Sequence, residues 1–261
     1  MNIIAFRRKN AFWLLVALLG LSFFNRNNTK SVETIAPETL QEPLQTPVSP
    51  PQVVRFSQYG YDYELEALYQ YEINAMLVHK LNYRTFSIHN YDKIFPFDVC
   101  LIWGENLSKK IYRAKTLSFS QDCRFCWADW REPLSFGWGE ISNNHLLVTD
   151  KRLERILASL VYGDQIKIRG RLVNVRARPS SGEGAEISWR TSVSRTDGGA
   201  GACEVILVED IRILKKANVF WRVLFPVSLY GLLLLIFWGM VSFFSSAVKR
   251  PFKDDREACI R

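Results

Sequence analysis

The chain has 261 residues, a net charge of +8 and 48% hydrophobic residues. Residues 25–218 hold 25 Lys and Arg against 23 Asp and Glu, whereas the two ends together hold 9 against 3. Because the basic excess lies at the ends, next to apolar segments, the charge gives no support to nucleic-acid binding. Five cysteines in a chain of this length also argue against a disulfide-rich scaffold.

Residues 1–24 are predicted to be an export signal. Arg7, Arg8 and Lys9 stand before fourteen uncharged, mostly apolar residues, Ala11 to Phe24, a pattern typical of a secretory signal. No Ala-x-Ala site follows the run, so an uncleaved signal anchor and a cleaved signal peptide both remain open. In either case we expect the residues that follow to be exported.

Residues 25–54 are predicted to form a disordered, proline-rich linker. The segment contains five of the ten prolines of the chain and almost no aromatic residues. Such a composition buries too little apolar surface to offset the entropy lost on ordering. We therefore expect a semi-extended tether between the first anchor and the folded part.

Residues 55–214 have the length of a single domain, and their patterns are mainly those of β-strands. Alternation of apolar and charged residues predicts a strand over Tyr61–Ala67. Glu72–Val78 fits a second strand or a short helix. Val99–Trp103 and Leu117–Trp127 are further strand candidates, because aromatic and β-branched residues are frequent in them.

One amphipathic helix is clear in the second half of this domain. Apolar residues recur there at helical spacing, with Asp150 as the expected N-cap and Gly163 as the expected C-terminal stop. The positions are Leu153, Ile156, Leu157, Leu160 and Val161.

Strands are expected again after the helix. Gln165–Arg171 alternates strictly, and the phase slips after it, which predicts a β-bulge near Gly170. Glu186–Arg195 and Cys203–Leu214 complete the run. The order of elements resembles a small closed barrel of the OB type, with additional strands before it. The predicted fold is therefore mainly β with one helix, between an N-terminal signal anchor and a C-terminal transmembrane helix.

Val223–Phe244 is an uncharged run of 22 residues. As a helix it extends about 33 Å, enough to cross a hydrocarbon core of about 30 Å. We predict a transmembrane helix over residues 219–245 and a basic cytoplasmic tail over residues 246–261. Both tails would then lie in the cytoplasm, with the domain on the outer side of the inner membrane.

Six residues are candidates for ligand binding. Most belong to the stretch from Trp189 to Glu204, where a glycine-rich turn could hold an anion beside charged side chains. The simpler interpretation is a hairpin loop in which Arg195 pairs locally with Asp197, and in which Cys203 is a buried small apolar residue. His145 precedes the helix, and a satisfied loop histidine is the simpler interpretation for it. The candidates are His145, Trp189, Arg190, Arg195, Asp197 and Cys203.

Cys123 and Cys126 have the spacing of a redox pair or of half a metal site. Their positions in a strand-like run put the two thiols on opposite faces, and there is no second pair of this kind for zinc. We therefore expect no metal and no cofactor. A structural disulfide between the two, or from one of them to Cys100 or Cys203, remains open.

Several stretches together are similar to an uncharacterised family of exported, membrane-anchored bacterial proteins. The similarity covers Gly60 to Leu214 and implies an exported location and the extent of the domain, but it brings no assigned activity. It is carried by Gly60-Tyr61-Asp62-Tyr63, Phe97 to Gly104, Ser118 to Gln121, Ser142 to Leu146, Gly163 to Ile166, Trp189 to Ser192 and Gly201 to Glu204.

Two functions of different classes follow. The first is a non-enzymatic binding or adaptor module near the bacterial inner membrane, with a bilayer, an envelope protein or a small ligand as partner and no nucleic acid. The alternative is a hydrolase or thiol-dependent enzyme that uses His145 and Cys203. A buried Cys203 with His145 more than about 10 Å away would exclude the enzyme, because a base must reach its nucleophile.

Overall fold

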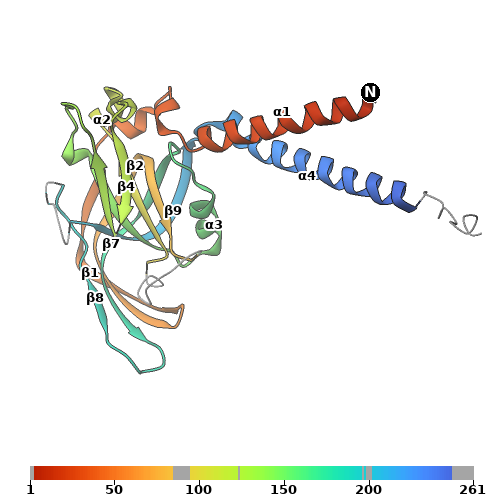
Figure 1. The fold of residues 1–261 in the computed structure, drawn as a ribbon. Helices are drawn as coiled ribbons and strands as arrows, with labels where there is room; N and C mark the ends of the chain where they lie inside the picture. The colour runs from red at the N-terminus through yellow and green to blue at the C-terminus, as the bar shows by residue number, and fades with distance from the viewer. Residues whose placement is uncertain (1–2, 85–94, 123, 196, 198–201, 249–261) are drawn as a thin grey trace, which may run out of the picture. The chain divides into compact units, whose positions relative to one another are not determined.

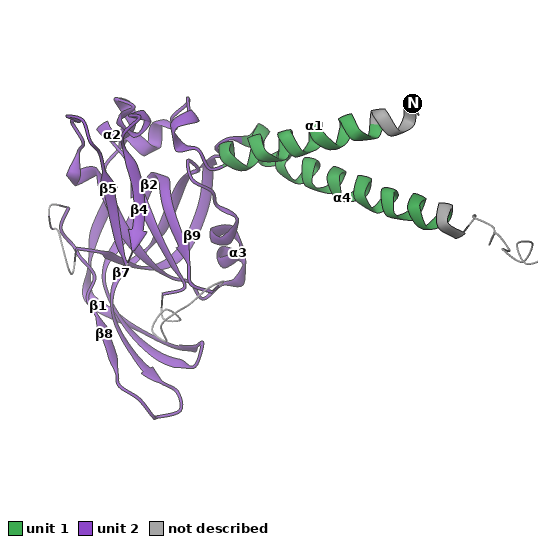
Figure 2. Cartoon of the chain, in the orientation of Figure 1, with its two compact units in different colours: residues 1–26, 219–261 green, residues 27–218 purple. Residues whose placement is uncertain are grey.

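The computed structural model describes residues 3–84, 95–122, 124–195, 197 and 202–248. It is mainly β, with 41% strand and 32% helix. The chain divides into two compact units: one consists of residues 1–26 and 219–261, and the other of residues 27–218 (Figure 2).

The helices and strands follow one another as in Figure 1. The helices are α1 (Ile3–Asn25), α2 (Glu105–Ser108), α3 (Lys151–Ser159) and α4 (Val219–Val248). The strands are β1 (Leu44–Gln58), β2 (Tyr61–Asn82), β3 (Phe97–Ile102), β4 (Ser118–Asp122), β5 (Phe125–Asp129), β6 (Ile141–Leu147), β7 (Gln165–Pro179), β8 (Ile187–Trp189) and β9 (Glu204–Lys215). Short 3₁₀ turns occur at Thr29–Ser31, Pro37–Leu40, Ile111–Arg113 and Trp138–Glu140.

Five strands of the large sheet close into a ring. β2 pairs with β3, β3 with β6, β6 with β9 and β9 with β7, and β7 pairs again with β2. The pairing of β6 with β9 is parallel, and the others are antiparallel. α3 connects β6 to β7. β1 and β8 extend the sheet beyond the ring, on β2 and β7 respectively.

Aliphatic side chains from alternate strand positions form the main core, for example Ile166 and Ile168 on β7. Gly170 comes next in this alternation, and a Cβ there would lie 2.1 Å from the carbonyl oxygen of Leu207. The register of β7 against β9 shifts between Arg169 and Gly170. The predicted irregularity near Gly170 is therefore found, with the extra residue, Glu209, on β9, and the close approach of the β9 backbone leaves no room for a side chain at Gly170.

The predicted disordered linker over residues 25–54 is wrong, because most of this segment belongs to the β unit. Its second half lies in β1, which is paired along β2. Val32 and Ala36 are buried, and the backbone N–H of Ala36 donates to Gln165 Oε1 at 2.5 Å. β1 is an edge strand with mostly exposed side chains. Prolines and polar residues are tolerated at an edge, where a strand needs hydrogen bonds on one side only.

Some other elements have bounds that differ from the predicted ones. Glu72–Val78 lies inside the long strand β2, and Leu117–Trp127 is divided between the two strands of the β4–β5 hairpin. Only three residues of Glu186–Arg195 form a strand. α3 has its predicted N-cap, since Asp150 accepts a hydrogen bond from the backbone N–H two residues on at 2.6 Å. It ends before Gly163, with Leu160 as its C-cap.

The β4–β5 hairpin is attached to the ring by a disulfide between Cys126 on β5 and Cys100 on β3. This is one of the pairings that the sequence left open. Cys123 lies outside the described residues, and Cys203 is a free, buried thiol. The hairpin is therefore held against the strands from which the polar side chains described below project.

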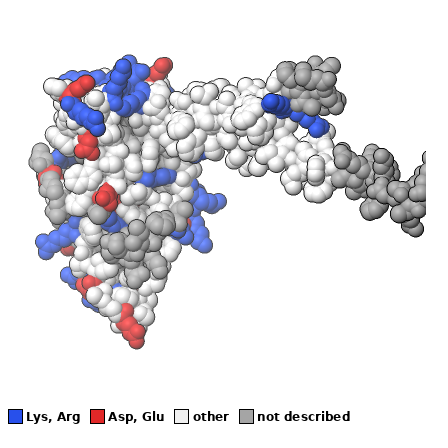
Figure 3. All heavy atoms as spheres, in the orientation of Figure 1, with Lys and Arg blue, Asp and Glu red and all other residues white. Residues whose placement is uncertain are grey.

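The smaller unit contains the two long helices. In α4, residues 219–245 are long and apolar enough to cross a membrane, with a mean hydropathy of 2.1, by length and composition only. α1 lies antiparallel beside α4: the Arg8 guanidinium is 5.6 Å from the Trp238 ring, and that of Arg26 is 3.8 Å from the Phe225 ring. Charges are sparse along both helices and mixed in sign over the β unit (Figure 3).

Candidate functional site

His145 lies on a strand of the ring and is fully buried, so the expectation of a loop histidine is wrong. Its direct cross-strand partner on β3 is Asp98, which is also fully buried. His145 Nδ1 lies 2.9 Å from Asp98 Oδ1. Directly opposite residues on neighbouring strands have adjacent side chains, so the strand register itself creates this pair.

Asp98 has two further partners from outside the ring. Arg124 Nη1 lies 3.1 Å from Asp98 Oδ1 and 3.4 Å from Oδ2, and the Tyr83 hydroxyl is 3.1 Å from Oδ2. Arg124 stands in the turn of the β4–β5 hairpin at φ 66° and is itself buried. The hairpin thus brings a positive charge over Asp98, and the pair is desolvated as a whole.

The environment of His145 favours its protonated form. Burial lowers the pKa of His145, but the charge of Asp98 and the hydrogen bond to it, with a smaller contribution from Cys203, raise this pKa to about 9. The rings of Phe95 and Trp189 pack against the imidazole, with centroids at 5.4 and 5.1 Å. Water is therefore kept from the ring, and Asp98 fixes its orientation.

Cys203 lies beside His145 and belongs to a chain of polar contacts. Asn143 Nδ2 donates to the Cys203 sulfur at 3.3 Å and to the carbonyl oxygen of Arg124 at 2.5 Å. Gln121 Nε2 donates to Asn143 Oδ1 at 2.7 Å, and His79 Nδ1 lies 3.1 Å from Gln121 Oε1. Cys203 is buried, as expected from the sequence, but its neighbours are polar.

A cleft of about 670 Å³ opens beside this cluster. The aromatic residues Trp127 and Trp138 line it and are 51% and 61% exposed. Exposed aromatic side chains that line a concave surface are typical of a binding site. The lining residues are Phe125, Cys126, Trp127, Ala128, Trp138, Gly139, Ile141, Ser142, Asn143, Arg195, Asp197, Ala202 and Cys203.

The charged residues at the cleft are paired, but not with each other. Arg195 Nη1 donates to Glu204 Oε1 at 2.8 Å, and Asp197 accepts from the Ser192 hydroxyl at 2.5 Å. The expected local pairing of Arg195 with Asp197 is therefore not found. Burial raises the pKa of Glu204 to about 7, against the attraction of Arg195. The glycines of the expected anion-binding turn, residues 198, 199 and 201, lie outside the described residues.

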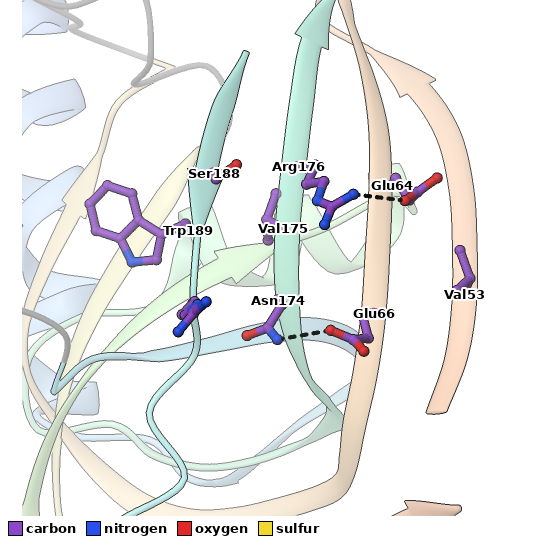
Figure 4. Close-up of a pocket in the computed structure, with 9 residues that line it drawn as sticks. Val53, Glu64, Glu66, Asn174, Val175, Arg176, Ser188 and Trp189 are labelled. Carbon is purple, nitrogen blue, oxygen red and sulfur yellow. Dashed lines mark hydrogen bonds and ion pairs between the residues drawn. The ribbon is translucent and has the colours of Figure 1, made fainter. Parts of the chain in front are cut away.

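Trp189 and Arg190 line a second cavity, of about 340 Å³. Figure 4 shows its polar side, where Glu64 pairs with Arg176 at 3.8 Å and Glu66 accepts from Asn174 at 3.0 Å. The charges and hydrogen-bonding groups on this side of the cavity are therefore already paired with one another. The other basic residues of β7 are paired with glutamates in the same way: Lys167 and Arg169 with Glu72, Arg171 with Glu209, and Arg178 with Glu186.

The sequence candidates are thus distributed over two places. Arg195, Asp197 and Cys203 line the larger cleft, and His145 stands beside Cys203. Trp189 contributes by packing on His145, whereas Arg190 lines the second cavity.

Five residues of the cluster and the cleft were not predicted from the sequence: Asp98, Arg124, Asn143, Trp127 and Trp138. The one available signal was Asp98 itself, a carboxylate inside the apolar strand Phe97 to Ile102, because a buried charge needs partners. Among the described residues, no group of three or more His, Cys, Asp or Glu side chains could hold a metal ion.

Comparison with known proteins found no matching family model, no similar curated protein and no similar solved structure. The resemblance to an exported bacterial family therefore stays a prediction. The enzyme alternative is not excluded by the geometry, because strand register brings Cys203 and His145 to the same face of neighbouring strands, and Asn143, two residues from His145, contacts the Cys203 sulfur at 3.3 Å.

Proposed function

We propose that the protein is a membrane-anchored binding module, and that its ligand is a small molecule with an apolar body held in the Trp127–Trp138 cleft. The cleft volume of about 670 Å³ carries this proposal, because pockets for small ligands have volumes of about 300–1,000 Å³. The walls are largely apolar, while Asn143, Arg195 and Asp197 supply polar groups for orientation. A concave site of this size fits a small ligand, whereas protein partners typically bind to larger and flatter surfaces.

The β unit is proposed to be an OB-like barrel. Support comes from its five-stranded ring, from the parallel pairing of β6 with β9, and from the helix that connects β6 to β7. Barrels of this type are five-stranded and partly open, and they bind ligands through a strand face and adjacent loops. Fold analogy alone names no ligand, so the proposal rests on the cleft.

The anchor is proposed to consist of both helices of the smaller unit, with α1 retained as a signal anchor in the bacterial inner membrane. Its antiparallel packing along α4 supports retention. Basic residues in the first turns of α1 and after α4 favour cytoplasmic tails and a periplasmic β unit. Protease treatment of intact spheroplasts tests this topology: the β unit should be digested, and a protected β unit would place it in the cytoplasm.

Fluorine NMR on the full chain in lipid nanodiscs tests ligand binding. All eight tryptophans are labelled as 5-fluorotryptophan and assigned by single Trp→Phe variants, and 4-phenylbutyrate is added as an apolar probe. We expect the resonances of Trp127 and Trp138 to shift saturably. Trp13 is the matched control, because it is 59% exposed but belongs to α1. Equal shifts at Trp13 and Trp138, or none at Trp127 and Trp138, would refute the binding function.

A further inference from the structure

Three neighbouring strands bring a thiol, an imidazole and a carboxylate to one face of the sheet. Asp98 on β3 is directly opposite His145 on β6. β6 and β9 pair in parallel, and Asn144 is opposite Glu204. The residues just before these two, Asn143 and Cys203, are therefore also opposite each other. Successive residues of a strand alternate between faces, and Asn143, His145 and Cys203 therefore share the face of Asp98.

The hydrogen bonds within this group determine which nitrogen of His145 faces which neighbour. Asp98 accepts the hydrogen bond of His145 Nδ1 at 2.9 Å, so Nε2 is the ring nitrogen left for another group. Nε2 is buried and has no well-aligned hydrogen bond among the described residues. Strand register puts Cys203 on the same face as His145, and its side chain contributes to the electrostatics of the ring. A nucleophile beside a base, which a third group orients, is the general arrangement for covalent catalysis.

The thiol also has a route to a ligand. Cys203 lines the Trp127–Trp138 cleft, although only 6% of the residue is exposed. Asn143 Nδ2 donates to the sulfur at 3.3 Å. If a substrate carbonyl carbon were bonded to this sulfur, the same N–H group would be near the carbonyl oxygen, on which negative charge develops. The apolar walls would hold the organic group attached to such a carbonyl.

We propose that Cys203 is the nucleophile of an acyl-transfer site whose substrates are esters or thioesters with an apolar acyl group. His145 acts as the base and acid, Asn143 as the oxyanion donor and Asp98 as a positioning residue. The inference rests on the proposed function, because the acyl group occupies the same cleft.

The reaction balances with water as the second substrate. The Cys203 thiol gives its proton to His145 Nε2 and the sulfur attacks the carbonyl carbon. A carbon–sulfur bond forms, and the carbonyl electron pair moves to the oxygen near Asn143. Collapse breaks the bond to the alcohol or thiol leaving group, which takes a proton from His145 Nε2. Water, deprotonated by His145, then attacks the thioester carbonyl carbon. The carbon–sulfur bond breaks, the carboxylic acid is released, and the Cys203 sulfur takes the proton back from His145 Nε2.

The test uses the full chain in nanodiscs with p-nitrophenyl 4-phenylbutyrate, and p-nitrophenyl acetate as an ester without the apolar body. Acid quenching, digestion and peptide mass spectrometry locate the acyl group. We expect a 4-phenylbutyryl thioester on Cys203, and faster release of p-nitrophenolate from the longer ester. Cys203→Ala should abolish both, and Cys259→Ser is the control for a thiol elsewhere in the chain.

Two variants separate catalysis from structure. His145→Gln should slow acylation by about 10²-fold or more, since general acid–base groups contribute about 10²–10⁴-fold. Asp98→Asn should move the acidic limb of the pH profile of acylation, which a purely structural role would leave in place. A further measurement uses the wild-type chain, so it does not depend on whether a variant folds. Iodoacetamide should alkylate Cys203 at a rate that depends on pH in the same way as acylation.

Acyl groups spread evenly over the cysteines, or p-nitrophenolate release unchanged in Cys203→Ala, would overturn the inference. A disulfide between Cys203 and Cys126, formed during the reaction, would overturn it too, because the thiol would then take part in thiol–disulfide exchange with the Cys100–Cys126 bond. The two proposals fail separately. If 4-phenylbutyrate shifts the Trp127 and Trp138 resonances but Cys203 is not acylated, binding stands and acyl transfer fails; if neither occurs, both fail.

Discussion

Replacing Asp98 with asparagine keeps the size of the side chain but removes the negative charge on which two buried cations depend. Arg124 and His145 both contact Asp98 Oδ1, at 3.1 and 2.9 Å. Removing one partner of a buried ion pair costs about 3–5 kcal/mol, because the other charge stays buried and uncompensated. In a domain of this size, each kcal/mol corresponds to about 2–4 °C in Tm, so we expect a decrease of about 6–20 °C near pH 6.

The pH dependence gives a second and sharper readout. The folded-state pKa of His145, about 9, exceeds its ordinary value of 6.5. Its charge therefore contributes stability that is fully present below about pH 6.5 and is lost as the pH rises through 9. A difference of 2.5 pKa units corresponds to about 3 kcal/mol. In Asp98→Asn the attraction of Asp98 is lost, and burial outweighs the smaller contribution of Cys203. The pKa of His145 should therefore fall below 6.5, and the variant should instead lose stability at acidic pH.

Two measurements on the full chain check this reasoning. Thermal unfolding followed by circular dichroism from pH 5.5 to 9.5 gives the stability, and NMR of ¹³C-labelled histidine, assigned with His→Gln variants, gives the pKa of His145. Asp62→Asn is the matched control, since this exposed carboxylate bonds only the hydroxyls of Ser57 and Ser180 among the described residues. The reasoning is refuted if Asp98→Asn unfolds like this control, or if the pKa of His145 does not move.

Three other predictions concern the fold. Gly170→Ala should cost about 1–3 kcal/mol or prevent folding, since its Cβ would meet a backbone oxygen at 2.1 Å; Gly139→Ala, whose nearest such atom lies at 4.0 Å, should leave Tm unchanged. Cys126→Ser should lower stability by about 3–4 kcal/mol, because the disulfide spans 26 residues, and reductant should have no further effect on this variant in urea unfolding. Asp150→Ala should cost about 1 kcal/mol through the lost N-cap of α3, whereas an unchanged urea midpoint would show that the cap adds nothing.

Sequence patterns predicted the elements that are determined by residues near one another in the chain. The apolar run of α4 and the N-cap of α3 each depend on residues close together in the chain, and both are found where expected. The register shift at Gly170 also lies where the sequence predicted it, although the contact there is with β9. The linker prediction failed because it used composition alone. Residues 44–58 gain their order from hydrogen bonds to β2, and the composition of a segment does not show that such a partner strand is present.

The candidate site depended on contacts between residues distant in the sequence. The sequence by itself singled out His145 and Cys203 as chemically capable residues, together with an apolar helix long enough to cross a membrane. Strand register decided the rest: it placed Asp98 opposite His145 and Cys203 beside Asn143, on three strands that are far apart in the chain. Only the folded ring and its disulfide-bound hairpin turn these residues into one buried cluster at a cleft, because pairing between strands fixes which side chains are neighbours and sequence spacing does not.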